Sequence, residues 1–168
     1  FHIFNVLANQ NSDLTSFDPQ DYDSVMKSSG CMIMGVTAVK EFESDTGIAM
    51  ALKSNLETTL LAEGFDLKTA KGAAGVVVGG STIFEETPGL MDNIEHAFST
   101  LAALTGNAMV HRGIYEDPEK EKLVVYTLIG GMDRPQTRLE ELTKFLKLKN
   151  PRVENTVGQH FEDYGSSL

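Results

Sequence analysis

Two carboxylates, Asp18 and Asp21, stand three residues apart at the start of a predicted helix, and no other residues of this chain are better spaced for chemistry. Asp18 can cap a helix, Pro19 suits the first helical position, and Asp21 is a carboxylate three residues after the cap. Together these three features predict that a helix starts here. Both side chains then lie on one side of the first turn, where the helix dipole favours their ionised form. Such a pair can orient a water molecule or hold a hydrated Mg²⁺. The simpler alternative, that the pair only caps the helix, stays open at this point.

The other residue types that carry chemistry lack the spacing that a site needs. The four histidines show no ligand-like spacing with one another or with Cys31, which argues against a His/Cys metal site. We expect His111 to be a structural histidine on a strand face and Cys31 to be a core residue. The glycine-rich segment 72–80 has no Lys after it and no helix expected directly behind it, so it fails the phosphate-binding fingerprints. We therefore expect this chain alone to hold no nucleotide, cofactor or metal.

The elements that must position the carboxylates follow from the hydrophobic periodicity. We expect four strands, at residues 31–39, 72–80, 108–115 and 123–130. Of two long helices, the first is capped by Ser44 and Asp45, and the second opens at residues 85–88. The polar residues 116–121 predict a turn, so the last two strands are expected to form a hairpin.

The order of these elements, after the short helix that begins at Asp18, is β-α-β-α-β-β. It predicts a two-layer α+β fold, in which a mixed four-stranded sheet carries its two long helices on one face. The buried stripes are expected to be Ile48, Leu52 and Leu56 on the first helix and Leu90, Ile94, Ala97, Phe98, Leu101 and Leu104 on the second.

Composition and charge limit the kinds of partner. The 168 residues are 41% hydrophobic and 23% charged, with a formal net charge of −10, which predicts a folded domain. The excess of acidic residues argues against a nucleic acid or an anionic membrane as partner. A single cysteine, Cys31, suits a reducing compartment, and no apolar run approaches the ~18 residues of a membrane span. We expect a cytoplasmic protein.

The two ends of the chain are expected to differ from the domain between them. Residues 1–12 are interpreted as the end of a longer helix, because apolar residues recur there at helical spacing without a capping residue before them. The domain itself is assigned to residues 13–132. Residues 133–168 form an extension with six basic and six acidic residues, in which residues 137–148 predict a short amphipathic helix. That helix could recruit a partner or pack on its own domain, and both remain open.

Residues 14–26, 30–35 and 65–72 carry a resemblance to a known family. The first segment, Leu-Thr-Ser-Phe-Asp-Pro-Gln-Asp-Tyr-Asp-Ser-Val-Met, resembles the synergy loop of FtsZ, Asn-x-Asp-x-x-Asp, and the short helix that follows it. The second resembles the FtsZ strand Gly-x-Ala-Met-Met-Gly, and the third its Ile-Asp-Leu-x-x-Ala-x-Gly segment. The resemblance covers roughly residues 1–132. By it, the chain is identified as the C-terminal domain of a divergent FtsZ-like protein of the tubulin/FtsZ GTPase family.

The resemblance implies an active site shared between subunits. In this family GTP and Mg²⁺ sit on one subunit, and the next subunit of the filament inserts its synergy-loop carboxylates beside the γ-phosphate. Asp18 and Asp21 match these catalytic carboxylates, and Ser16 stands at the third site position, where FtsZ has Asn. The resemblance implies a GTPase that polymerises head-to-tail through residues 14–22, in cell division or a related cytoskeletal role. An adaptor protein could bind the extension at residues 133–168.

The same resemblance limits what this fragment can do alone. The glycine-rich GTP signature of the family is absent from the sequence. GTP and Mg²⁺ are therefore assigned to the full-length protein, and the fragment by itself is expected to be inactive.

Two further hypotheses remain open. A free-standing α+β domain could form a closed oligomer that binds an anionic small molecule between subunits, since chorismate-mutase-like enzymes share this topology. A family member that has lost hydrolysis could act as a scaffold, which the Ser16 substitution favours. None of these hypotheses includes a nucleic-acid partner or a membrane span.

Overall fold

The computed structural model describes residues 1–58 and 64–149. The chain divides into two compact units, Phe1–Arg134 and Pro135–Leu168. The part of the predicted extension that follows residue 149 lies outside the described residues.

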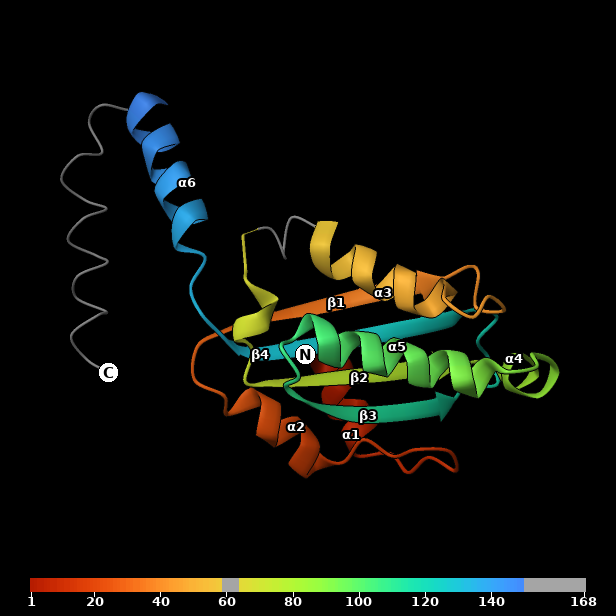
Figure 1. The fold of residues 1–168 in the computed structure, drawn as a ribbon. Coiled ribbons are helices and arrows are strands. Elements are labelled where there is room, and N and C mark those ends of the chain that lie inside the picture. Colours follow the sequence, from red (N-terminus) through yellow and green to blue (C-terminus); the bar gives the residue numbers. More distant parts are fainter. Residues whose placement is uncertain (59–63, 150–168) are drawn as a thin grey trace. The chain divides into compact units, whose positions relative to one another are not determined.

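One four-stranded sheet organises the first unit (Figure 1). Its strands, in the order in which they lie side by side, are β1 (Cys31–Val39), β4 (Leu123–Met132), β2 (Gly72–Gly79) and β3 (Met109–Glu116). β2 runs parallel to β3, and β4 runs antiparallel to both β1 and β2. The predicted mixed four-stranded sheet of an α+β fold is confirmed.

The predicted hairpin between the last two strands is wrong. β4 lies between β1 and β2, so the connection from β3 to β4 crosses the end of β2, where the Asp117 amide donates to the Gly79 carbonyl oxygen at 2.9 Å. The polar turn indicated a reversal of direction but not which strand lies next to which. β4 is nearly all buried and pairs on both edges, which satisfies its backbone groups as well as its apolar side chains.

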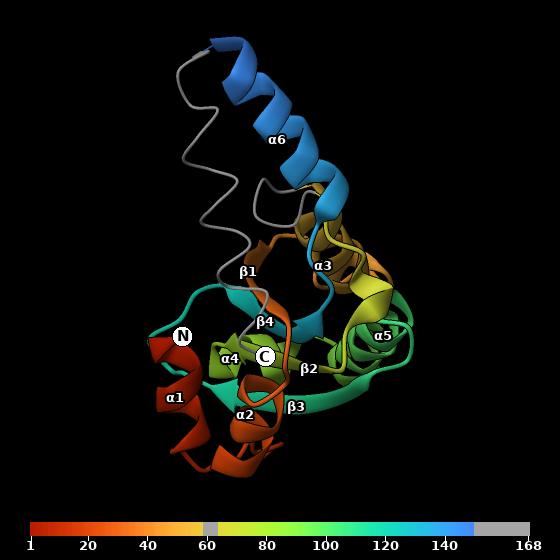
Figure 2. The same cartoon turned by 90° about the vertical axis from the view of Figure 1, so that its left-hand side faces the viewer.

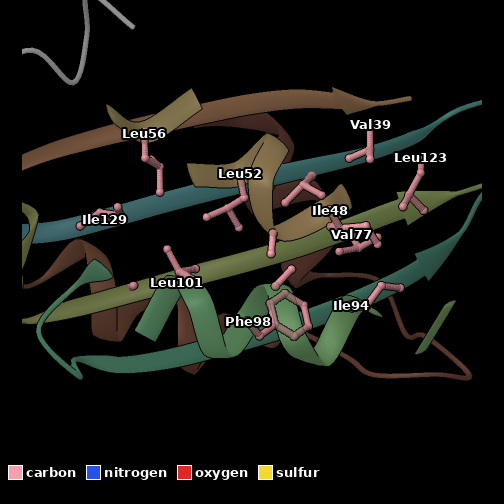
Figure 3. Packing of buried hydrophobic residues seen from close by; sticks show 14 of the residues in the cluster. Val39, Ile48, Leu52, Leu56, Val77, Ile94, Phe98, Leu101, Leu123 and Ile129 are labelled. Carbon is pink, nitrogen blue, oxygen red and sulfur yellow. The ribbon is translucent and has the colours of Figure 1, made fainter. Parts of the chain in front are cut away.

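Two long helices, α3 (Gly47–Thr58) and α5 (Leu90–Leu104), cover one face of the sheet (Figures 1 and 2). Their inner side chains form the larger core with β2 and β4, as Figure 3 shows. The predicted stripes are confirmed for Ile48, Leu52, Leu56, Leu90, Ile94, Ala97, Phe98 and Leu101, which are all buried. Leu104, at the end of the second stripe, is only half-buried against the same core.

The start of the second long helix differs from the prediction. Residues 85–88 do not open it, because a short helix, α4 (Ser81–Glu86), ends there instead. α5 begins after Gly89, whose φ of +75° is a left-handed conformation that favours glycine. α4 also follows Gly80 directly, which corrects the expectation that no helix stands behind the glycine-rich strand. It has six residues and no side-chain cap.

The opposite face of the sheet carries α1 (His2–Ala8) and α2 (Pro19–Met26) (Figure 2). A second, smaller core forms there, in which the Phe4 and Phe17 rings meet edge to face with centroids 6.0 Å apart. Val25 of α2 and Leu128 of β4 are buried in the same cluster. The sheet is therefore covered on both sides, and the second side holds the predicted carboxylates.

The second unit contains one described helix, α6 (Gln136–Lys149), which includes the segment predicted to be an amphipathic helix. Within it, the Thr143 hydroxyl donates to the Leu139 carbonyl oxygen at 2.7 Å. No helix within residues 1–58 and 64–149 is both long enough and apolar enough to cross a membrane.

Candidate functional site

The loop before α2 is fixed along the free edge of the sheet. β3 is an edge strand, and the Ile114 amide donates to the Thr15 carbonyl oxygen at 2.8 Å. The Ser12 hydroxyl donates to the Ile114 carbonyl oxygen. These bonds occupy backbone groups that an edge strand otherwise leaves unpaired, and they hold residues 12–17 against β3.

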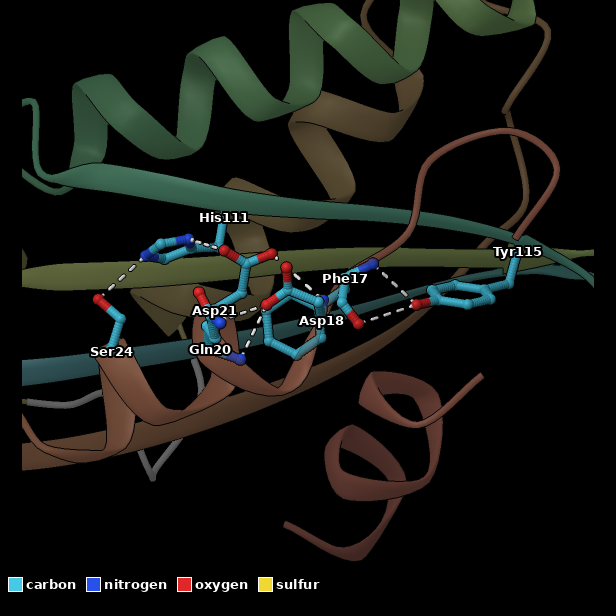
Figure 4. Close-up of polar contacts among 7 residues, drawn as sticks. All are labelled: Phe17, Asp18, Gln20, Asp21, Ser24, His111 and Tyr115. Atoms are coloured by element: carbon cyan, nitrogen blue, oxygen red, sulfur yellow. Dashed lines mark hydrogen bonds and ion pairs between the residues drawn. The ribbon is translucent and has the colours of Figure 1, made fainter. Parts of the chain in front are cut away.

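Tyr115 of β3 joins this loop to α1, and Figure 4 shows its contacts with Phe17 of the loop. Its buried hydroxyl accepts from the Phe17 amide at 2.8 Å and lies 2.9 Å from the Leu7 carbonyl oxygen and 3.1 Å from that of Phe17. Burial raises the pKa of Tyr115, whereas the hydrogen bond from the Phe17 amide lowers it. The negative charges of Asp21 and Asp18 raise the pKa further. The phenol therefore stays protonated at neutral pH and can donate to one of the two carbonyl oxygens.

Gly113 lets the loop approach the strand closely. A Cβ atom at this position would lie 2.7 Å from the Phe17 Cβ and 2.9 Å from the Tyr115 ring. Because non-bonded carbons need about 3.5 Å or more, a larger residue at position 113 would displace Phe17 and the loop with it.

Asp18 and Asp21 come together in the first turn of α2 as a reciprocal capping box. Asp18 Oδ1 accepts from the Gln20 amide at 2.8 Å and from the Asp21 amide at 2.9 Å. Asp21 Oδ2 accepts from the Asp18 amide at 3.2 Å. The capping role considered from the sequence is therefore real. It leaves Asp18 exposed, with both of its capping bonds on one oxygen.

His111 is a site residue that sequence reasoning missed. Its Nδ1 lies 2.6 Å from Asp21 Oδ1, and its Nε2 lies 3.2 Å from the Ser24 hydroxyl (Figure 4). The Asp21 side chain is 28% exposed and that of His111 is 13% exposed. The sequence does contain a signal: His111, Gly113 and Tyr115 alternate on one face of β3, and all three contact the loop or α2.

Ser16 does not join the carboxylates. Its hydroxyl accepts from the Ser12 amide at 3.0 Å and lies 3.4 Å from the Ser12 carbonyl oxygen. It is exposed and shapes the loop before α2. Of the three residues predicted for the site, the structure brings together Asp18 and Asp21.

The oxygens of this site suit a hard cation but do not enclose one. Mg²⁺ prefers six oxygen ligands, and Asp18 and Asp21 are carboxylates that it accepts. Both Asp21 oxygens already accept bonds within the subunit, so any ion would complete its coordination with water and with groups from outside this chain. Within residues 1–58 and 64–149 no cluster of three or more His, Cys, Asp and Glu side chains could hold a metal. A hollow of about 310 Å³ lies next to the loop, lined by residues 10–14, Tyr115 and Glu116. It is open and polar, and neither Asp18 nor Asp21 lines it.

The strand order and the two long helices on one face are the fold of a C-terminal domain of the tubulin/FtsZ class, to which comparison with known protein families assigns the chain. Known structures share the fold. The GTPγS-form protofilament of Bacillus thuringiensis serovar israelensis TubZ is 17% identical, with a TM-score of 0.70 over 96% of this chain and 40% of that chain. The chain belongs to the family described as "Tubulin/FtsZ-like protein TubZ-like, C-terminal domain", whose model matches residues 4–143.

Two further structures extend the comparison. A structure described as that of type III plasmid segregation TubZ is 18% identical, with a TM-score of 0.65 over 90% of this chain and 38% of that one. An FtsZ dimer from M. jannaschii is 24% identical, with a TM-score of 0.53 over 79% of this chain and 36% of that one. A comparison with curated protein sequences found no match. The chain thus spans about 40% of the length of the TubZ protofilament subunit.

Proposed function

We propose that this chain is the part of a TubZ-like GTPase that supplies Asp18 and Asp21 to GTP held by the neighbouring copy in a filament. The observation that carries the proposal is the pairing of two carboxylates in one turn, on a loop that β3 fixes in place. The domain spans about 40% of the TubZ chain, which supports a nucleotide site outside it.

The chemistry suits this division between subunits. Phosphoanhydride hydrolysis needs an in-line water and charge neutralisation, with little covalent work for the protein. An exposed carboxylate such as Asp18 can accept a hydrogen bond from that water and align it, while Asp21 fixes the backbone of the loop. Mg²⁺, when bound, would neutralise charge on the phosphate oxygens. Hydrolysis would then depend on assembly, because neither subunit holds the whole site.

A head-to-tail contact through residues 14–22 would also account for filaments. The loop on one copy meets a different surface on the next, and a contact of this kind extends indefinitely unless its rotation closes a ring. The solved TubZ relative is itself described as a protofilament, which supports this proposal.

Plasmid segregation is the better candidate than cell division for the cellular task. The family is TubZ-like, and one relative is described as type III plasmid segregation TubZ. We place the protein in the cytoplasm, where such a task is carried out, with the extension at residues 133–168 as the site for an adaptor protein.

The test uses the full-length protein with Asp18→Asn and Asp21→Asn. Asparagine also caps helices, so Asp18→Asn keeps the first turn of α2. We expect GTP turnover per assembled subunit to fall about a hundredfold or more in either variant, with assembly retained. Asp23→Asn, on the same helix but paired with Lys27, is the matched control. Unchanged turnover in both site variants would contradict the proposal, and filaments without any turnover in the parent would favour the scaffold hypothesis.

A further inference from the structure

We propose that His111 is a positioning residue for Asp21, resting on the function proposed above. It holds the carboxylate in the one orientation in which the loop can meet the nucleotide of the next subunit. The two residues lie 90 positions apart in the sequence, and β3 brings them within 2.6 Å.

The proton positions at His111 follow from the chemistry of its neighbours. An ionised carboxylate only accepts hydrogen bonds, so the Nδ1 that faces Asp21 Oδ1 must carry the proton. Nε2 is then either an acceptor from the Ser24 hydroxyl, in the neutral ring, or a donor to it in the imidazolium. In both states the bond to Asp21 is kept.

This bond completes the restraint of the Asp21 side chain. Oδ2 accepts from the Asp18 amide and Oδ1 accepts from His111, so neither oxygen can rotate without breaking a bond. The strand that carries His111 is held in the sheet, where position 111 is paired with Ala74 of the inner strand β2. Asp21 in turn fixes the backbone of Asp18, the exposed carboxylate of the pair. The restraint therefore passes from the sheet to the loop.

Asp21, His111 and Ser24 are connected in the order of a hydrolase triad, but the surroundings do not fit that role. Ser24 lies inside α2, where the backbone N–H groups are used by the helix and offer no oxyanion site. The stronger bond of His111 is the charge-assisted one to Asp21. It is 2.6 Å long, whereas the contact between His111 and Ser24 is 3.2 Å long.

The experiment compares His111→Asn with His111→Leu in the full-length protein. The amide nitrogen of asparagine occupies nearly the position of Nδ1 and can donate to Asp21, whereas leucine fills similar space without a donor. We expect His111→Leu to lower kcat for GTP per assembled subunit about tenfold, because a small misplacement of a reacting group is costly. We expect His111→Asn to restore most of that loss and Ser24→Ala to change little. The critical concentration for assembly should stay the same in all three.

A double variant separates positioning from a structural role. If His111 acts through Asp21, adding His111→Leu to Asp21→Asn should lower turnover no further. Parent-like turnover in His111→Leu, with Asp21→Asn still impaired, would overturn the positioning role and leave the proposed function standing. Equal losses in both His111 variants, together with lower melting temperatures, would also overturn it. A parent protein that assembles but does not hydrolyse GTP would overturn both proposals.

Discussion

The two faces of the sheet are covered by contacts of different kinds. Between the sheet and α3 and α5 the buried contacts are apolar, with Ile48, Leu52 and Phe98 fully buried (Figure 3). The polar contacts on that face, from Asn55 to the Val36 carbonyl oxygen and between Arg112 and Glu95, involve exposed groups. Between the sheet and α2 there is a smaller apolar cluster, and along β3 a row of polar contacts from Tyr115 to His111 (Figure 4). This difference indicates two roles, which we call the division of work between the faces: the face under α3 and α5 provides most of the stability, and the face under α2 fixes the loop that carries Asp18 and Asp21.

The largest effect is expected on the apolar face. Phe98→Ala removes a fully buried ring and should lower the free energy of unfolding by about 3–5 kcal/mol. Chemical denaturation followed by circular dichroism measures the change. Met91→Ala is the control on the same helix, because Met91 is 42% exposed and its truncation should cost about 0.5 kcal/mol or less. A small effect of Phe98→Ala would mean that the core can close around the gap.

A pair of glycine variants compares the two faces directly. Gly113→Ala places a Cβ 2.7 Å from Phe17, and Gly75→Ala places one 2.8 Å from the Phe98 ring on the other face. Overpacking of this kind should cost about 1–3 kcal/mol at either position. Only Gly113→Ala moves the loop, so only it should also lower GTP turnover per assembled subunit in the full-length protein. Equal turnover losses in both variants would break the proposed division of work.

The apolar face was also the more predictable one. The stripes of α3 and α5 repeat every three or four residues, and this local pattern is enough to place them on a sheet. The strand order was not predictable in the same way. The polar turn before β4 is local, whereas the insertion of β4 between β1 and β2 depends on pairings far apart in the chain. The hairpin prediction failed for that reason.

The candidate site divides in the same manner. Asp18 and Asp21 are signalled by a four-residue capping pattern, so their proximity could be predicted from the sequence. His111 could not be assigned to them, because its partner lies in another element and its own surroundings read as an ordinary strand face. Sequence patterns therefore identify site residues that lie in the same turn. To identify a site residue on another element, such as His111, one must also know how β3 and α2 are aligned with each other.

Tyr115→Phe tests the polar contacts more gently. It removes the hydroxyl that accepts from the Phe17 amide and should lower the free energy of unfolding by about 1–2 kcal/mol. Tyr126→Phe, on the same face with its ring against Phe4, is the control.

The same tyrosine predicts a pH dependence. The folded-state pKa of Tyr115 is raised above its ordinary value of 10.0, so its contribution to stability is complete below that value. It is lost as the pH rises through the raised pKa, and denaturation curves of the parent should show this loss where those of Tyr115→Phe do not. A Tyr115-dependent slope near neutral pH would contradict the assignment.

The smallest effect is expected at the second ion pair of α2. Lys27 Nζ lies 2.6 Å from Asp23 Oδ2, the same distance as between His111 and Asp21, but these side chains are 76% and 58% exposed. Solvent screens an exposed pair, so Lys27→Met, which keeps the apolar stem, should change the free energy of unfolding by about 0.5 kcal/mol or less and leave GTP turnover unchanged. If the His111 variants lower turnover and Lys27→Met does not, the two contacts differ in effect although both are 2.6 Å long. The burial that β3 gives to the contact between His111 and Asp21 would then explain the difference. A large loss in Lys27→Met would instead mean that α2 as a whole, rather than its His111 contact, sets the loop.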